Sequence, residues 1–584
     1  MDEPEQGSRL DEGGRRARFE WTRGGTMSEP AAGFDMEADV VVLGTGGAGL
    51  TAALAAHDFG AGEVLILEKY GMIGGTSAMS GGMLWIPLND QEAENGVEDS
   101  YDEIIAYLDG LAAENTLDPE NVSAFLDAGP EMLRYFDEKT PVRLKLFPGF
   151  PDYQPNAVGG KMHGSRSLDN EAFPFDELGS WGKWVNPPKT GWPRRTSMIE
   201  DYYTPDLGPE VMAERETRDF RGAGQALIGS LLKGVIDRGI PIRRESRART
   251  LIREGDRVVG VVTEEAGATI RIKARKGVVI ATGGFEWNEQ LVKSFLRGPM
   301  TGPVSVPECE GDGLLMAMEV GASLGNMPNA WWMMSSQEMA AHGRGKANYL
   351  IGNQERTRPG SILVNRSARR FANEAVSYNA LGPVLHNFDE NTHDYANLPY
   401  WVIVDSRYTS KYRFFTASHG SGAPDWAVSA ATIEELGDKL GLDGAVLHET
   451  VERFNADVRA GRDTEFGRGD ATYDNFWGDK DFEAPYRTLG VIDQAPFYAV
   501  KMEAGVLGTC GGPRANEHAQ VIDWSDQPIE GLYVCSNAMS SPTAGVYGGA
   551  GGTLGPGMTF GYIAGRHAAQ SRVNPEYVCP TSLP

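Results

Sequence analysis

Uninterrupted apolar runs mark the strands that the sequence predicts most plainly. Val40–Leu43 and Val64–Leu67 contain no polar residue, and segments 277–288 and 531–535 each include a similar run. Runs without polar alternation are typical of strands that are buried on both faces of a parallel sheet. Segment 241–274 alternates instead between apolar and polar residues, which predicts a small antiparallel meander of hairpins.

Apolar residues at helical spacing occupy much of the chain between these runs. Segments 91–133 and 310–327 both repeat apolar residues with the period of an α-helix. Near the C-terminus Leu554, Met558 and Tyr562 continue this spacing directly after a glycine-rich stretch. The alternation of helices with buried strands predicts an α/β fold built around a mainly parallel sheet.

Length and charge narrow the classes of partner. The chain has 584 residues, too many for one compact core, so we expect more than one domain. Its formal net charge of −27 argues against nucleic acid or an anionic membrane as a partner. No apolar run reaches the ~18 residues that span a bilayer, so no membrane span is expected. We therefore expect a cytoplasmic protein, with loose membrane association left open.

The N-terminal segment, the cysteines and the histidines bear on export, disulfide bonding and metal binding. Residues 1–37 are polar, charged and glycine-rich, and they lack the apolar core of a secretory signal. We expect them to form a disordered extension, and the true start could be Met27 or Met36. The four cysteines have no paired spacing and the nine histidines form no ligand-like pairs. Neither a disulfide framework nor a metal site is therefore predicted.

A glycine motif follows the first apolar run. Gly44 to Gly49 reads G-x-G-x-x-G, and Glu68 ends the second run. In a dinucleotide-binding fold the glycines allow a tight turn and a close approach to pyrophosphate, and the acid binds ribose hydroxyls. The alternative is a plain glycine-rich strand turn. The residues expected to contact the nucleotide are Gly44, Gly46, Gly47, Ala48, Gly49 and Glu68.

A second stretch of small residues begins at Glu68 and indicates which dinucleotide binds. Residues 68–87 read EKYGMIGGTSAMSGGMLWIP, so small side chains and backbone amides can surround a second pyrophosphate face and a flavin ring. This stretch resembles the flavoprotein family of fumarate reductases and 3-ketosteroid dehydrogenases, whose signature combines a Glu with GGTSAxSGG. The resemblance implies FAD rather than NAD, with contacts from Lys69, Gly74, Gly75, Thr76, Ser77, Ser80, Gly81 and Gly82.

The same resemblance implies cofactor contacts elsewhere in the chain. The strand within 277–288 ends in the turn A-T-G-G, which closes over FAD in this superfamily. This assigns Ala281, Thr282 and Gly283 to the cofactor, with an ordinary strand-end turn as the alternative. Asn537 is expected to meet the ribityl chain or a phosphate.

The stretch 536–564 combines a glycine run with the start of a predicted helix. Glycines let the backbone approach a bulky flat group, and a helix N-terminus favours developing negative charge. Tyr547 opens the run, so the residues indicate either a site where an oxygen or a ring gains charge or a tight interdomain turn. The resemblance assigns Tyr547 and the Gly551 N–H to the ketone oxygen of a steroid. The cofactor contacts expected here are Gly552, Thr553 and Leu554.

Two more tyrosines complete the expected active site. Segment 358–374 carries R-x-G-x-I-x-V-N…R-R-F-x-N-E, which resembles the catalytic domain of ketosteroid dehydrogenases and implies that Tyr378 is the general base. The aromatic loop 147–155 is similar to a substrate loop of that family and implies Tyr153 as its neighbour. A buried structural tyrosine and a packed surface loop are the alternatives. The run AWWMM at 330–334 is either core or the wall of an apolar ligand site.

The resemblance covers residues 38–570 and implies a complete layout. A Rossmann-like FAD-binding domain, residues 38–338 and 506–584, would carry an inserted α+β substrate (catalytic) domain at 339–505. The implied reaction is FAD-dependent 1,2-desaturation of a 3-ketosteroid, a small apolar ketone. A tyrosine would remove the alpha proton and a hydride would pass to flavin N5. The electron acceptor is left unknown.

Two other functions stay open. An ene reductase of the fumarate-reductase kind would send hydride outward to a polarised alkene, and the enzymes of that kind that act on dicarboxylates need a clamp of arginines and a histidine. No matching His/Arg arrangement accompanies Tyr547, although arginines are available at 358, 366, 369 and 370. A flavin-bearing subunit that only passes electrons to a partner is the other alternative. The absence of a C-x-x-C-H haem motif weakens it.

Overall fold

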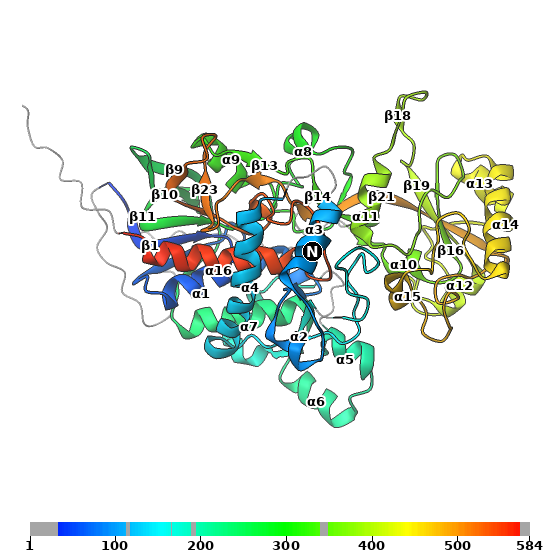
Figure 1. The fold of residues 1–584 in the computed structure, drawn as a ribbon, viewed down its shortest axis with the longest axis horizontal. Helices are drawn as coiled ribbons and strands as arrows, with labels where there is room; N and C mark the ends of the chain where they lie inside the picture. Colours follow the sequence, from blue (N-terminus) through cyan, green and yellow to red (C-terminus); the bar gives the residue numbers. More distant parts are fainter. Residues whose placement is uncertain (1–32, 113–116, 165, 189–193, 339–348, 573–584) are drawn as a thin grey trace, which may run out of the picture.

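The computed structural model describes residues 33–112, 117–164, 166–188, 194–338 and 349–572 (Figure 1). Residues 1–32 of the expected extension lie outside the described residues. Met36 and Glu37, also assigned to that extension, instead begin strand β1 (Met36–Leu43) and pair with β11 (Ala268–Ile280). An ion pair of 2.9 Å between Glu37 and Arg275 lets an acidic residue join the sheet, which the polar sequence pattern concealed.

The first sheet has eight strands, and its centre is parallel. Strands β1, β2, β8, β11 and β24 pair in parallel, whereas β9, β10 and β23 are antiparallel additions. The strand order is β23 (Gln520–Ile522), β24 (Pro528–Val534), β11, β1, β2 (Val64–Leu67) and β8 (Ile242–Arg243), and β10 (Arg257–Glu265) joins β11 to β9 (Ser246–Glu254). The α/β fold, the buried strands and the meander are therefore confirmed.

Two helices from opposite ends of the chain lie side by side along this sheet (Figure 1). They are α1 (Gly47–Asp58) and α16 (Leu554–Gln570). A Cβ atom at Gly561 would stand 2.5 Å from the carbonyl oxygen of Ala48, and one at Gly565 would collide with that of Ala52. Because glycine has no Cβ, the two backbones can meet, which joins the C-terminal segment to the N-terminal motif.

The segment between β2 and β8 adds helices and a three-stranded sheet beside this core. The sheet has the order β3 (Leu84–Trp85), β5 (Ser167–Asn170), β4 (Leu144–Leu146). The helix expected over 91–133 is divided into α2, α3 and α4. The helices of this segment are α2 (Asp90–Glu94), α3 (Tyr101–Ala112), α4 (Pro119–Lys139), α5 (Met198–Tyr203), α6 (Pro209–Thr217) and α7 (Ala223–Asp237).

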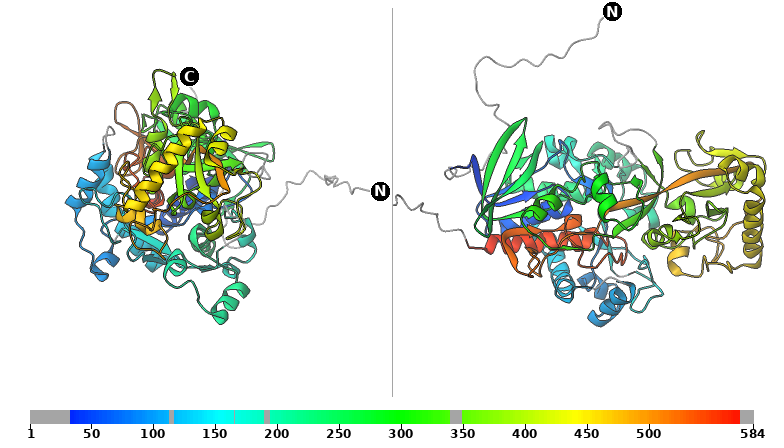
Figure 2. Two further views of the ribbon diagram at one scale, coloured as in Figure 1. Left: turned by 90° about the vertical axis from the view of Figure 1, so that its right-hand side faces the viewer. Right: turned by 90° about the horizontal axis from the view of Figure 1, so that it is seen from above.

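The second sheet has seven strands. Its order is β15 (Tyr349–Ile351), β14 (Ala330–Glu338), β21 (Phe497–Thr509), β19 (Tyr400–Asp405) and β16 (Ser361–Asn365), and β12 (Gly302–Pro303) and β20 (Val428–Ala430) also pair with β21. The long strand β21 connects the centre of the molecule with the outer lobe, as the view from above in Figure 2 shows. The helices of the chain segment that carries this second sheet are α10 (Gln354–Thr357), α11 (Tyr378–Leu385), α12 (Ser406–Lys411), α13 (Ile433–Leu440), α14 (Gly444–Ala460) and α15 (Thr472–Trp477).

The expected domain limits at 338 and 505 fall inside this second sheet. Strand β14 ends at Glu338 and pairs with β15, and β21 continues past residue 505 to Thr509. A hydrophobic run identifies a strand but does not say which sheet it joins. The division of the chain stays a prediction, and the strand pairing favours including β12 and β14 in the inserted unit.

One helix is shorter than its sequence predicts. Only α9 (Asp312–Glu319) forms within 310–327, and a two-stranded pair that includes β13 (Leu324–Gly325) follows it. Gly321 has a φ of +92°, a left-handed conformation that ends helices. Among the described residues, no helix combines the length and the apolar character that crossing a bilayer requires.

Candidate active site

The nucleotide motif forms the turn between β1 and α1. Gly44 has a φ of +112°, and a Cβ there would collide with the carbonyl oxygen of Ala281. A Cβ at Gly49 would collide with the carbonyl oxygen of Gly44, so only glycine lets α1 begin this close to the strand end. Glu68 follows β2 directly and accepts the N–H of Thr45 at 3.1 Å. Burial raises the pKa of Glu68 despite its hydrogen bonds.

The second glycine stretch packs across from this turn. Gly74, with a φ of +99°, precedes the short 3-10 helix η1 (Gly75–Met79), and its N–H donates to Thr45 Oγ1 at 3.1 Å. Ser77 Oγ accepts the N–H of Gly47 at 3.1 Å. Two glycine segments that the sequence marks separately are therefore joined by hydrogen bonds.

One cavity of about 460 Å³ brings together nearly all of the predicted cofactor residues. Gly74 and Gly552 are the two that do not line it. Gly74 turns the chain into η1, and a Cβ at Gly552 would stand only 2.8 Å from the ring of Tyr547. The predicted residues that line the cavity are Gly44, Gly46, Gly47, Ala48, Gly49, Glu68, Lys69, Gly75, Thr76, Ser77, Ser80, Gly81, Gly82, Ala281, Thr282, Gly283, Asn537, Thr553 and Leu554.

The chemistry of this lining fits a dinucleotide. The hydroxyl of Thr282 is buried and has no hydrogen-bond partner among the described residues, so it is available to a bound group. Thr553 and Leu554 stand at the N-terminus of α16, where unpaired amides favour an anion. Lys69 is less available, because its Nζ lies 2.9 Å from Asp312 and 3.2 Å from Glu310.

The three predicted tyrosines lie together in the wall of the same cavity. The hydroxyl oxygens of Tyr153 and Tyr378 are 2.7 Å apart. The rings of Tyr153 and Tyr547 stack with centroids 5.0 Å apart, and Tyr378 stands edge-on to Tyr547 at 5.4 Å. All three side chains are buried. They come from the loop before β5, the first residue of α11 and the glycine run before α16.

Burial controls the protonation of these phenols. Burial, followed by the phenols of Tyr153 and Tyr547, raises the pKa of Tyr378 well above its ordinary value of 10. Burial also raises the pKa values of Tyr153 and Tyr547, and the hydroxyls of Tyr378 and Thr553 offset part of the rise at Tyr547. At neutral pH the resting site therefore presents uncharged hydroxyls, which suit a neutral carbonyl ligand.

Gly551 lies on the same loop as Tyr547. It has a φ of +96°, and a Cβ there would stand 2.5 Å from the backbone of Leu84. Both Gly551 and Tyr547 line the cavity just before α16 begins. Only glycine fits this approach without strain, so the loop presents a peptide group beside a phenol.

A buried hydrogen-bond bridge fixes this loop against the Tyr153 loop. The carbonyl oxygen of Gly548 accepts both the Tyr107 hydroxyl at 2.7 Å and the Tyr153 N–H at 2.9 Å. The Tyr107 oxygen in turn accepts the N–H of Gln154 at 3.2 Å. One phenol on α3 therefore ties together the two segments that carry Tyr153 and Tyr547.

A Tyr107→Phe variant is expected to turn over about tenfold more slowly while it keeps its FAD. The change leaves the Gln154 N–H without a buried partner, at a cost of about 1–3 kcal/mol, and loosens the catalytic loops. Steady-state kinetics and the flavin absorbance measure both effects. Tyr135→Phe is the matched control, because Tyr135 bonds Asp58 at 2.8 Å outside the cavity lining and should turn over normally. A normal rate in Tyr107→Phe would contradict this role.

The AWWMM run forms part of β14, so its side chains lie in two different environments. Alternate side chains of a strand point to opposite faces. Trp331 packs on Tyr547 with ring centroids 5.3 Å apart, and Met333 lines the cavity. Trp332 and Met334 belong to other core clusters. Trp332 and Met334 are therefore core residues, whereas a role of Trp331 and Met333 in the wall of a ligand site stays a prediction.

Sequence reasoning missed several residues of the site. Tyr473 on α15 packs edge-on against Tyr153 at 5.1 Å, and nothing in its local sequence distinguishes it. Thr45 occupies an unspecified position of the glycine motif, yet its side chain bonds both Glu68 and the Gly74 N–H. Met198 and Trp477 also line the cavity. A long-range contact map, rather than any motif, would have been needed to find these residues.

Positive charge is scarce around the cavity. Of the described residues, Lys69 alone contributes a basic side chain to the lining. The four arginines considered for a carboxylate clamp lie elsewhere and have other partners. Arg358 donates to the Gly478 carbonyl, and Arg366, Arg369 and Arg370 pair with Asp394, Glu449 and Glu374, respectively.

Comparison with known proteins agrees with this geometry. The model of the FAD binding domain family matches residues 39–554. The chain is 38% identical over 540 residues to a 4-oxocyclohexanecarboxylate 2-dehydrogenase of Sinomonas cyclohexanicum, covering 91% of this chain and 92% of the relative. It is 35% identical over 568 residues to a 3-oxosteroid 1-dehydrogenase of Mycobacterium tuberculosis, covering 91% and 98%.

A solved structure shows the same fold. The 3-ketosteroid delta1-dehydrogenase from Sterolibacterium denitrificans, in complex with 1,4-androstadiene-3,17-dione, has a TM-score of 0.83 and 32% sequence identity to this chain. The similarity covers 91% of this chain and 99% of that one. The chain is accordingly an FAD-dependent oxidoreductase that belongs to the FAD binding domain family, in the branch that contains the 3-oxosteroid 1-dehydrogenases.

Proposed function

We propose that this enzyme introduces a double bond between C1 and C2 of a 3-ketosteroid. The observation that carries the proposal is the group of three buried tyrosines in the wall of the FAD cavity. When bound, FAD supplies the acceptor for the hydrogen that leaves the beta carbon as hydride. The protein residues then have two remaining tasks, to hold the ketone oxygen and to remove the alpha proton.

Tyr547 and the Gly551 N–H are suited to the first task. Removal of a proton next to a ketone places negative charge on the ketone oxygen, so donors aimed at that oxygen lower the barrier. The bridge through Tyr107 and the Gly548 carbonyl holds this loop in place. Tyr547 is buried, and burial strengthens its hydrogen bond to a developing oxyanion.

Tyr378 is suited to the second task. Its hydroxyl lies 2.7 Å from that of Tyr153, and either oxygen can act as the donor. Tyr378 has to lose its own proton before it can accept the one from the substrate, and a hydrogen bond donated by Tyr153 stabilises the phenolate that results. Because burial raises the pKa of Tyr378, this stabilisation is needed for the tyrosine to act as a base.

The shortage of positive charge argues against a dicarboxylate ene reductase and against a keto acid as the substrate. A dicarboxylate ene reductase needs cations in the substrate site, whereas the four arginines considered for this role are engaged outside the described cavity lining. The identity of 38% to a 4-oxocyclohexanecarboxylate 2-dehydrogenase makes a one-ring keto acid the second candidate substrate. Its carboxylate would find only Lys69, which is already paired with Asp312 and Glu310. These contacts favour an uncharged ketone.

With 4-androstene-3,17-dione, we expect a kcat/KM at least about 100-fold higher than with 4-oxocyclohexanecarboxylate. Enclosing a carboxylate without a partner costs several kcal/mol, whereas the steroid adds apolar contact with the aromatic wall. Bleaching of an electron-accepting dye under air-free conditions measures both rates. The product position is read by mass spectrometry and NMR.

A control separates substrate choice from a damaged preparation. The flavin spectrum and its reduction by dithionite report how much enzyme carries FAD, and both rates are divided by that amount. Faster turnover of the keto acid would make the one-ring ketone the natural class. Turnover of neither ketone, together with reduction of an enone by the chemically reduced enzyme, would instead favour the ene reductase.

A further inference from the structure

Arg356 is a buried arginine beside the tyrosine group. It lies in α10, and its side chain is fully buried. One Nη atom donates to the carbonyl oxygens of Glu374 and Val376, the latter at 2.8 Å, and the other donates to Asn353 Oδ1 at 2.8 Å. Asn353 itself lines the cavity. The guanidinium therefore holds the backbone two residues before Tyr378 and a polar side chain of the cavity wall.

The charge of Arg356 has no direct counter-ion among the described residues. No carboxylate there forms an ion pair with it, and its Nε has no hydrogen-bond partner. A buried charge normally has a carboxylate partner, since burial without one is costly. Such a group is often retained for a functional reason.

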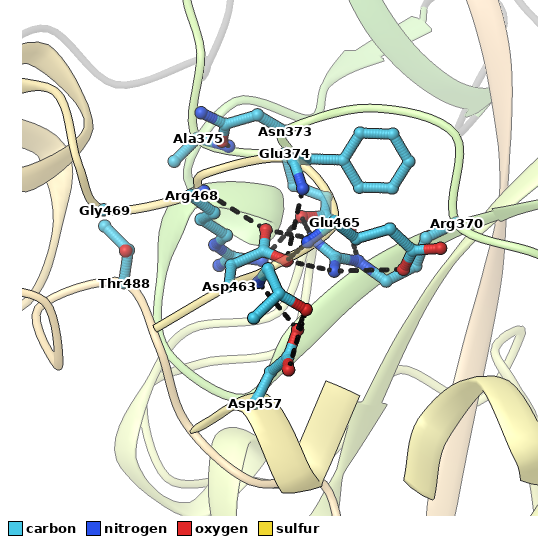
Figure 3. A network of polar contacts seen from close by, with 12 residues as sticks. Arg370, Asn373, Glu374, Ala375, Asp457, Asp463, Glu465, Arg468, Gly469 and Thr488 are labelled. Atoms are coloured by element: carbon cyan, nitrogen blue, oxygen red, sulfur yellow. Dashed lines mark hydrogen bonds and ion pairs between the residues drawn. The ribbon is translucent and has the colours of Figure 1, made fainter. Parts of the chain in front are cut away.

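The neighbouring arginines show the usual arrangement. Arg370 and Arg468 share Glu374 at 2.8 and 3.1 Å, and Arg370 also bonds Asp463 at 2.9 Å (Figure 3). Glu465 stands 3.8 Å from Arg370 as a third carboxylate, and the Arg370 guanidinium holds the pKa of Asp463 at about 2 against the effect of burial. This network fixes the segment that leads to Tyr378 through ion pairs, whereas Arg356 holds the same segment through neutral carbonyl oxygens.

The charge of Arg356 acts on Tyr473, a neighbour of the tyrosine group. Helix α10 packs against α15, which carries Tyr473, and Tyr473 contacts Tyr153 at 5.1 Å. Burial raises the pKa of Tyr473, and the Arg356 guanidinium is the first influence that opposes the rise. A cation on this side of the group stabilises the phenolate form of the tyrosines that share it.

We propose that Arg356 positions the Tyr378 base and assists its proton transfer, by holding the backbone before Tyr378 and by placing a positive charge on the α15 side of the tyrosines. This inference rests on the proposed role of Tyr378. It explains how a phenol in an apolar site can act as a base with no charged partner in contact. Arg356 acts through Tyr378 and touches neither substrate nor cofactor, so it is a positioning residue.

The sign of the effect follows from the groups that face Arg356. Tyr473 and Asp474 face it from α15, Tyr400 from β19, Glu355 from α10 itself and Arg468 from the neighbouring network. Removal of the guanidinium charge raises the proton affinity of the tyrosines, so Tyr378 loses its proton less readily. The rate should then need a higher pH. We expect a displacement of about one pH unit, the size that a single nearby charge produces at an effective dielectric constant near 20.

The test uses the FAD-loaded enzyme with 4-androstene-3,17-dione in deuterated buffer. Arg356→Gln should keep the flavin spectrum and the KM, exchange the alpha proton about tenfold more slowly at pH 7, and recover as the pH rises. Arg356→Lys keeps the charge and should restore most of the rate. Asp474→Asn removes the carboxylate that faces Arg356 and should move the pH profile the opposite way, to lower pH.

Each outcome decides the matter. Equal losses in Arg356→Gln and Arg356→Lys would show that packing matters and charge does not, which overturns the proposal. A wild-type profile in Arg356→Gln would do the same. If Arg356→Gln fails to bind FAD, an unchanged profile in Asp474→Asn overturns it instead. If exchange persists in Tyr378→Phe, the assignment of Tyr378 as the base is wrong. If exchange is lost in Tyr378→Phe but normal in Arg356→Gln, only the inference about Arg356 is wrong.

Discussion

Replacement of Tyr378 by phenylalanine is expected to lower kcat by about 1,000-fold and to stop exchange of the substrate's alpha proton with solvent. The ring stays in place against Tyr547, but the hydroxyl that lies 2.7 Å from Tyr153 is removed. Incubation of the variant with 4-androstene-3,17-dione in deuterated buffer, followed by mass spectrometry, measures the exchange step by itself. FAD content should be unchanged, because Tyr378 belongs to the tyrosine group and not to the glycine turns that are expected to hold FAD.

Tyr408→Phe provides the matched control for this variant. Tyr408 is also buried in the second-sheet unit, where its hydroxyl bonds the Glu355 carbonyl at 3.3 Å, and it does not line the cavity. We expect it to exchange and to turn over at nearly the normal rate. Exchange at the normal rate in Tyr378→Phe would move the base to another residue, with Tyr153 the first candidate because it shares the same hydrogen bond.

Tyr547→Phe is expected to lower kcat by about 100-fold or more, which corresponds to about 3 kcal/mol of lost stabilisation of the ketone oxygen. The aromatic stacking on Tyr153 and the contact with Trp331 should survive, since both involve the ring. The Gly551 N–H remains, so some activity should remain as well. Pre-steady-state reduction of the flavin by the steroid measures the chemical step directly.

Two observations accompany the Tyr547 experiment. Tyr533→Phe, which removes a hydroxyl that bonds His567 and Ser571 outside the cavity lining, should behave as the normal enzyme does. In Tyr547→Phe the loss should appear in kcat more than in KM, because the oxygen gains charge only during reaction. Steroid reduction of the flavin at an undiminished rate in this variant would remove Tyr547 from the mechanism.

Local motifs allowed the cofactor half of the site to be predicted from the sequence. Gly44 and Gly49 are needed where backbone atoms approach too closely for a Cβ, and such needs leave a fixed spacing in the chain. The same holds for Gly74, whose positive φ begins η1. Because these constraints act within a few residues, a single sequence reveals them.

The tyrosine group could not be derived in that way. Tyr153, Tyr378 and Tyr547 come from three segments that are well separated along the chain, so only family resemblance suggested that they meet. Tyr473 and Arg356 carry no motif, and long-range packing alone brings them to the site. The limits of the inserted unit stay a prediction for a related reason, since strand pairing across the chain decides which sheet a run joins.

The contact between α1 and α16 also has a consequence for biosynthesis. The ribosome releases the nucleotide motif early, whereas α16 and the loop with Tyr547 emerge more than 480 residues after α1. Until then, the glycine turn after β1 lacks the wall that Thr553 and Leu554 contribute. Tight capture of FAD should therefore follow translation rather than accompany it, and nascent chains stalled before residue 554 should release the cofactor.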